Sequence, residues 1–150
     1  MKIGLVINPQ SGVGGSVALK GSDGAELQEL AKRRDGEPRG VERAHAFLER
    51  LLLIIDDLTK EVSWKTWGDE MGETVLQSHQ VDFEVLGDPK SPTVGADTSE
   101  ACSVISGAGV DILIFVGGDG TARDVMEGIL PGTLVLGVPS GVKMHSGVFA

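Results

Sequence analysis

The feature that most constrains this chain is a short apolar run followed at once by glycines. Asp111–Val116 reads Asp-Ile-Leu-Ile-Phe-Val, and Gly117–Thr121 reads Gly-Gly-Asp-Gly-Thr. A continuous run rich in β-branched residues predicts a strand buried on both faces, as in the interior of a parallel sheet. A helix is predicted to begin at Gly120 or Thr121. Its expected apolar face consists of Val125, Met126 and Ile129.

Strand-like and helix-like segments alternate along the rest of the chain. The other predicted strands are Lys2–Ile7, Glu61–Trp67, Asp82–Leu86 and Thr133–Val138. Helices are expected over Ala25–Arg33, Val41–Leu53 and Gly72–Ser78, and for one turn near Ser16–Leu19. A further helix is expected to be capped by Thr98 or Ser99 and to run to about Ser106, where Gly107 and Gly109 end it. Such alternation predicts right-handed βαβ units. The expected fold class is therefore α/β, a Rossmann-like, doubly wound, mainly parallel sheet with helices on both faces.

Composition narrows the classes of function. The chain has 150 residues, enough for one domain, and a formal net charge of −9. This charge argues against nucleic acid as a partner, because binding to phosphate backbones requires a basic face. Cys102 is the single cysteine, so neither a disulfide framework nor metal-ligand spacing is present, and no dedicated protein metal site is predicted. The apolar runs are too short to cross a membrane and no signal peptide is recognisable, so a cytoplasmic protein is expected.

The turn Gly117–Thr121 is the strongest candidate for chemistry. Glycines allow the backbone to approach a phosphate or ribose closely, and the following helix directs its free N–H groups into the same space. Asp119 places a carboxylate among these groups. It could accept a proton from a substrate hydroxyl or hold a magnesium ion that bridges phosphates. The alternative is a structural turn with Asp119 as the helix N-cap.

A second glycine-rich loop follows the first strand, over Asn8–Gly15. No GxxxxGK[ST] pattern fits it, and the fingerprint GxGxxG fails because Val17 stands where the last glycine belongs. These mismatches disfavour a P-loop NTPase and a Rossmann dehydrogenase. An asparagine and a nest of backbone amides remain, which could bind phosphate at the same sheet edge as Asp119.

Together, these two loops resemble the superfamily of NAD kinases, diacylglycerol and sphingosine kinases, and phosphofructokinases. The resemblance covers essentially the whole chain and is greatest to the ATP-NAD kinase family, N-terminal domain, in its AcoX-like branch. The segments that indicate this branch are Leu19–Gly24 and Gly137–Met144.

The resemblance implies phosphorylation of NAD at the 2′-hydroxyl of its adenosine ribose, to give NADP. ATP or polyphosphate would be the donor and Mg²⁺, or another divalent cation, would assist. Asp119 is then the catalytic residue, which activates or positions the hydroxyl. The expected substrate- and nucleotide-binding residues are Asn8, Ser11, Gly12, Gly14, Gly15, Gly117, Gly118, Gly120, Thr121, Ser140 and Lys143. Homo-oligomers are also implied, and neither nucleic acid nor a membrane is an expected partner.

The chain also departs from this family. The family's β-rich second domain and its Asn-Glu or Asn-Asp pair are not found, so residues 1–150 are expected to be a truncated N-terminal nucleotide-binding domain. Two alternatives stay open: a kinase of a lipid or sugar hydroxyl, and a non-catalytic nucleotide-binding or regulatory module. Roles of Lys20, Asp23 and His145 are left undecided.

Four other side chains are expected to have no part in the site. His45 and His79 are interpreted as surface residues without ligand-spaced partners, and Trp64 and Trp67 as packing residues. Cys102 is expected in the core.

Overall fold

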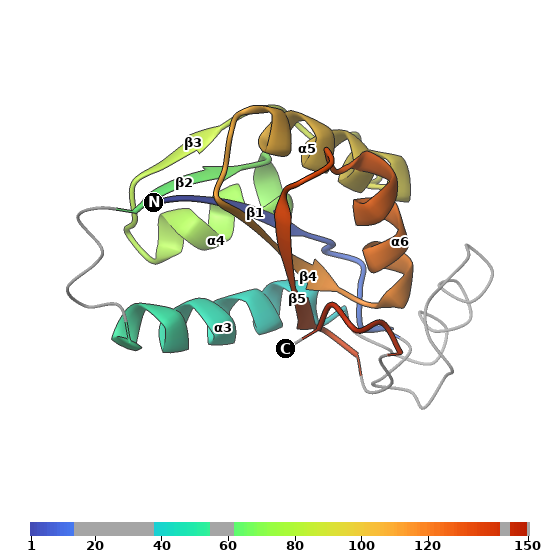
Figure 1. The fold of residues 1–150 in the computed structure, drawn as a ribbon. Helices are drawn as coiled ribbons and strands as arrows, with labels where there is room; N and C mark the ends of the chain where they lie inside the picture. Colours follow the sequence, from blue (N-terminus) through green and yellow to red (C-terminus); the bar gives the residue numbers. More distant parts are fainter. Residues whose placement is uncertain (14–37, 55–61, 142–144, 150) are drawn as a thin grey trace.

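The computed structural model describes residues 1–13, 38–54, 62–141 and 145–149, and shows a single five-stranded parallel sheet. Its strand order is β3-β2-β1-β4-β5 (Figure 1). The strands are β1 (Lys2–Ile7), β2 (Ser63–Thr66), β3 (Phe83–Val85), β4 (Ile112–Gly117) and β5 (Leu134–Pro139). All five predicted strands and the predicted parallel α/β class are therefore confirmed.

Helices cover both faces of this sheet (Figure 1). The described helices are α3 (Gly40–Ile54), α4 (Glu73–Ser78), α5 (Gly95–Gly107) and α6 (Asp119–Gly128), with a 3-10 turn η1 (Asp69–Met71). The helices α3 and α4 pack on one face, and α5 and α6 on the other. The doubly wound arrangement is thus confirmed for the described part of the chain.

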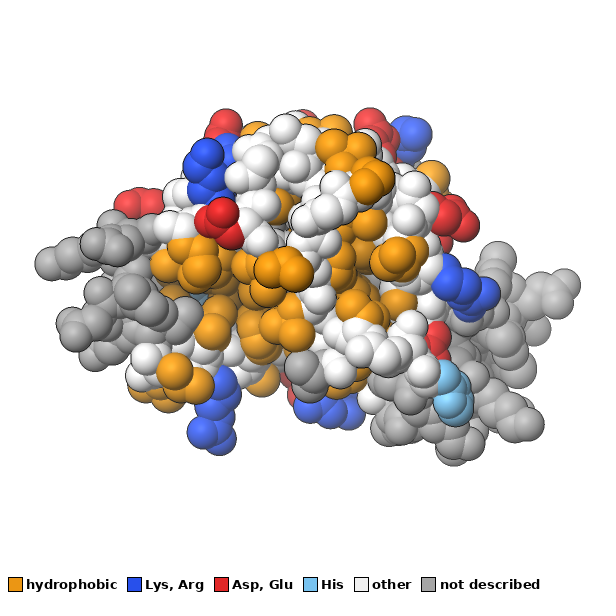
Figure 2. Space-filling model, viewed as in Figure 1, with side chains coloured by type: hydrophobic (Ala, Val, Ile, Leu, Met, Phe, Trp, Pro, Cys, Tyr) orange, Lys and Arg blue, Asp and Glu red, His pale blue; other side chains and the backbone are white. Residues whose placement is uncertain are grey.

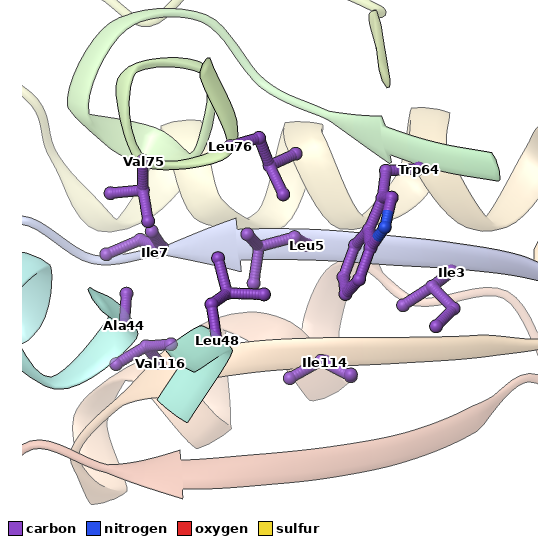
Figure 3. Packing of buried hydrophobic residues seen from close by; sticks show 10 residues of the cluster. All are labelled: Ile3, Leu5, Ile7, Ala44, Leu48, Trp64, Val75, Leu76, Ile114 and Val116. Carbon is purple, nitrogen blue, oxygen red and sulfur yellow. The ribbon is translucent and has the colours of Figure 1, made fainter. Parts of the chain in front are cut away.

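Successive side chains of β1 and β4 point to opposite faces of the sheet and so contribute to two separate hydrophobic clusters. On β1, Leu5 and Ile7 face α3 and α4, whereas Val6 faces α5 and α6. In Figure 3, Leu48 of α3 and Val75 of α4 lie against this first set of strand residues. Full burial of such side chains stabilises the fold by about 1.5–3 kcal/mol each. Because both faces are covered, the central strands β1 and β4 have no polar side, as their continuous apolar sequence predicts.

The packing residues predicted from the sequence are confirmed as such. Trp64 and Trp67 are each 3% exposed and belong to opposite clusters. Cys102 is buried, and burial, with a smaller effect of the nearby Asp124 charge, raises the pKa of its thiol to about 12. The thiol is therefore protonated at neutral pH and acts as an apolar packing group.

The helix α5 begins at Gly95, so the predicted cap at Thr98 or Ser99 was wrong. The carboxylate of Asp97 accepts a hydrogen bond from the backbone N–H of Val94, at 2.8 Å, and closes the first turn. The Ser99 hydroxyl donates to a carbonyl of α6 instead.

Two further expectations need correction. Met126 of α6 is 66% exposed, because the buried face of this helix is formed by Thr121, Ala122 and Val125. His45 and His79 are half-buried and contact each other, so they are not separate surface residues.

Hydrophobic side chains gather across the middle of the molecule, around the edge strand β5 (Figure 2). Leu134 at the start of β5 is 67% exposed. Among the described helices, none is both long and apolar enough to span a membrane. The expected helix over Ala25–Arg33 and the turn near Ser16–Leu19 lie outside the described residues.

Candidate phosphate-binding site at the edge of the sheet

The strand order reverses between β1 and β4, which are neighbours in the middle of the sheet. Ile7 pairs with Val116, and the backbone N–H of Asn8 donates to the carbonyl of Val116 at 2.9 Å. The loops that follow the two strands therefore start side by side. In doubly wound sheets, ligands bind at such a reversal, beyond the carboxyl ends of the strands.

Asn8 ties these two loops together. Its Nδ2 donates a hydrogen bond to Thr121 Oγ1, at 2.9 Å, across 113 positions of the sequence. Its Oδ1 accepts from the backbone N–H of Gln10, at 3.0 Å, which shapes the start of its own loop. The Ser11 hydroxyl, 3% exposed, donates to the Asn8 carbonyl at 2.7 Å. The side chain of Asn8 thus fixes both the local turn and its position against α6.

The end of β5 closes on the same place. The backbone N–H of Ser140 donates to the Gly117 carbonyl, at 3.0 Å. Gly12 has φ of +86°, and a methyl group there would lie 2.6 Å from the carbonyl oxygen of Ser140. Only glycine allows this close approach of the two backbones.

Ser140 also carries an unusual polar group. Its side chain is 2% exposed, and its hydroxyl has no hydrogen-bond partner among the residues that the structure describes. A buried hydroxyl without a partner costs about 1–3 kcal/mol, so such groups are rare away from functional sites. A phosphate or ribose oxygen at this edge would satisfy it.

The glycines of the turn Gly117–Thr121 have different roles. An added methyl group at Gly117 would collide with the Thr121 side chain, so this position must be small for the turn to fold. An added methyl at Gly118 would meet no atom within 4 Å. Gly118 is the N-cap of α6, and Gly120 lies in the first turn of the helix. The turn therefore presents open space directly at the positive end of a helix.

Asp119 is the first residue of α6. Its carboxylate accepts hydrogen bonds from the backbone N–H groups of His145 and Ser146, with distances from 3.0 to 3.2 Å. Because Gly118 holds the cap position, the alternative that Asp119 is the N-cap residue was wrong. A carboxylate has about four acceptor positions, so at least one is left for a substrate hydroxyl or a cation.

The structure brings together most of the predicted site. Asn8, Ser11, Gly12, Ser140 and the turn Gly117–Thr121 meet at this edge. Gly14, Gly15, Lys20, Asp23 and Lys143 lie outside the described residues.

Sequence reasoning missed the contact between Asp119 and the segment 145–146. The contact is made by backbone amides, which any residue other than proline supplies, so residue identity carries no signal for it.

The described residues contain no group of three or more His, Cys, Asp or Glu side chains arranged to hold a metal ion. Mg²⁺ commonly uses one or two carboxylates together with substrate phosphates. Asp119, at the helix end where phosphates would bind, fits that pattern.

Comparison with known families identifies the class of this domain. The family model of the ATP-NAD kinase N-terminal domain matches residues 3–150, so the chain belongs to this family. The recognition of the family from its two glycine loops is confirmed, and the chain is a domain of the kinase class. No curated protein and no solved structure matched the chain.

Proposed function

We propose that this chain is the N-terminal, nucleotide-binding half of an NAD kinase-like phosphotransferase. The reaction transfers a phosphoryl group from ATP or polyphosphate to the 2′-hydroxyl of the adenosine ribose of NAD, and gives NADP. The observation that carries the proposal is the hydrogen bond from Asn8 to Thr121. It holds both glycine loops beside one acidic side chain at the switch point of the sheet.

Phosphoryl transfer depends mainly on positioning and on stabilisation of negative charge. The amides at the start of α6 and the hydroxyls of Thr121 and Ser140 would bind phosphate or ribose oxygens. Asp119 would accept a hydrogen bond from the 2′-hydroxyl and orient it toward the donor. A methyl group added at Gly118 would meet no atom of the described residues within 4 Å, so there is room for a ligand beside this group.

A divalent cation and a lysine side chain would complete this chemistry. Asp119 is the carboxylate that would help to hold Mg²⁺ or another divalent cation, which neutralises charge on the donor phosphates. Lys143, which the family resemblance assigns to nucleotide binding, would offset phosphate charge in a protein whose net charge is −9.

We further propose that a β-rich second domain and a second copy of the chain belong to the working enzyme. The matching family model describes an N-terminal domain. Hydrophobic side chains also gather around the edge strand β5, as expected for a surface that another unit covers. We assign the protein to the cytoplasm.

The test measures phosphoryl transfer by the purified protein with Mg²⁺ and either ATP or polyphosphate as donor. NAD, a diacylglycerol and a sugar are offered separately as acceptors, and NADP is the product expected from NAD. Asp119→Asn should lower the rate of NAD phosphorylation by about 10²–10⁴-fold, the usual contribution of an acid or base. Asp111→Asn is the matched control. It makes the same chemical change at the opposite end of β4, where Asp111 accepts a hydrogen bond from the Lys2 N–H.

Equal loss in the two variants, or no loss with Asp119→Asn, would contradict the catalytic assignment. Phosphorylation of the lipid or sugar in place of NAD would keep the kinase class and change the acceptor.

A second candidate is a non-catalytic nucleotide-binding module. It is favoured by the engagement of both carboxylate oxygens of Asp119 with backbone amides, a structural role that needs no catalysis. Isothermal titration together with an activity assay separates the two candidates, because both bind nucleotide and only the kinase turns it over. Binding of NAD and ATP, without turnover by the protein joined to its second domain, would support the module.

A further inference from the structure

The two histidines on the α3–α4 face form a close pair. His45 lies on α3 and His79 follows α4 directly, 34 positions later. His45 Nδ1 and His79 Nε2 are 3.1 Å apart, and the ring centroids are 5.3 Å apart with planes tilted by 42°. Both rings are half-buried. The sequence did not predict this contact, because the two residues belong to separate segments of the chain.

The backbones that carry the two rings are fixed by the core. On α3, Ala44 and Leu48 are fully buried on either side of His45 along the helix. On α4, Val75 and Leu76 are fully buried, and the backbone N–H of His79 donates to carbonyls of both. The pair is therefore preorganised by packing, which limits the entropy lost when a common ligand binds both rings.

The separation of the two nitrogens suits a shared metal ion. Imidazole nitrogens bind Zn²⁺ at about 2.0–2.1 Å, which places two of them roughly 2.8–3.4 Å apart for angles between square and tetrahedral. The observed 3.1 Å lies in this range. Imidazole is a preferred ligand of Zn²⁺, Ni²⁺ and Cu²⁺ and a poor one for Mg²⁺. In the described part of the chain no third His, Cys, Asp or Glu completes a cluster, so water would fill the other positions.

The charges around the pair are compatible with such a site. Burial, followed by the proximity of His45, lowers the pKa of His79, and the Glu49 carboxylate opposes this effect. Glu49 lies one helical turn after His45, on the same side of α3, and would reduce the repulsion of a divalent cation.

We propose that His45 Nδ1 and His79 Nε2 form a two-histidine site for an exchangeable divalent transition-metal ion of the Zn²⁺ and Ni²⁺ type, which links α3 to α4. The site also connects to the phosphate-binding edge. The N–H groups of Arg39 and Gly40, at the start of α3, donate to the Ser11 carbonyl. A metal ion that holds α3 against α4 therefore also supports the loop that contains Asn8. This proposal does not depend on the phosphotransferase assignment.

The first test is a Ni²⁺ titration of the untagged, chelator-treated protein, followed by thermal unfolding. The sequence has three histidines, so His145 serves as the matched control. Wild type and His145→Gln should show the same saturable rise in Tm. His45→Gln and His79→Gln should each bind Ni²⁺ at least about tenfold more weakly, because a single imidazole loses the advantage of two linked ligands. Mg²⁺ at the same concentrations should produce no rise in any of the four.

The second test needs no variant and remains valid if a substitution prevents folding. In a proton–nitrogen spectrum of the three imidazole rings of the wild-type protein, Zn²⁺ should shift two rings together, at one midpoint. No shift at stoichiometric Zn²⁺ would show that the rings share only a hydrogen bond, and would overturn the proposal. Equal weakening of Ni²⁺ binding by His145→Gln would also overturn it.

Discussion

Gly12 and Gly118 lie at the same edge of the sheet, yet they are glycines for opposite reasons. Gly12 has a positive φ of +86°, and an added methyl group would lie 2.6 Å from the Ser140 carbonyl oxygen. Gly118 is extended, with φ of −110°, and an added methyl would meet nothing within 4 Å. The first is required for the protein to close on itself, whereas the second keeps space free. A glycine-rich loop is therefore not by itself a sign of a ligand.

The largest effect on stability is expected for Gly12→Ala. The positive φ and the clash with Ser140 together should lower the free energy of unfolding by about 2–3 kcal/mol. Urea unfolding followed by circular dichroism measures this. Gly132→Ala is the matched control, because Gly132 has φ of +89° and open space around it. If both variants lose the same amount, backbone conformation alone requires Gly12, and the close approach to Ser140 has no energetic role.

A smaller effect is expected for the hydrogen bond that joins the two loops. Asn8→Ala should lower the free energy of unfolding by about 1–2 kcal/mol, because the Gln10 N–H and Thr121 hydroxyl both lose a partner. A double-mutant cycle with Thr121→Ala should give a coupling energy of about 0.5–1.5 kcal/mol. A coupling energy near zero would mean that the loops are held together by packing alone.

Removal of the Asp119 carboxylate should lower the free energy of unfolding of the whole domain by a still smaller amount. Asp119→Ala loses favourable bonds at a partly exposed helix end, so we expect a decrease of about 1 kcal/mol in unfolding free energy. The local effect should be clearer. Hydrogen exchange at the amides of His145 and Ser146 should accelerate, while exchange in β4 changes only by the global loss. Unchanged exchange at these two amides would show that the bonds to Asp119 do not protect them in solution.

The smallest change in stability is expected for Gly118→Ala, within about 0.5 kcal/mol. The added methyl enters the space where we propose that the nucleotide lies, so NAD binding should weaken while folding is kept. Isothermal titration and urea unfolding measure the two properties on the same sample. A loss of stability as large as that of Gly12→Ala would remove the distinction between the two glycines.

The strands were predictable because burial on both faces produces a local pattern. Asp111–Val116 was expected as an interior strand, and β4 occupies Ile112–Gly117 between β1 and β5. The start of α5 was not predictable by the same means. Several residues near it could serve as a cap, and the choice depends on Asp97 and on the neighbouring α6.

The candidate site was partly predictable. The turn Gly117–Thr121 and Asn8 stand out by composition and by their place after a strand. The Ser140 hydroxyl, which has no partner among the described residues, does not stand out in the sequence, because its burial results from the approach of three loops. The contact between His45 and His79 was not predictable for the same reason, because their rings come from α3 and from the residue after α4, 34 positions apart.

By itself, the sequence determined the parallel α/β architecture and the positions of the two glycine loops, because hydrophobic periodicity and turn residues act over a few neighbouring positions. Only the tertiary structure decided which groups meet: Asn8 with Thr121, Asp119 with the amides of His145 and Ser146, and His45 with His79. These contacts depend on strand order, on helix packing and on backbone N–H groups. None of these is recorded in the identity of a single residue.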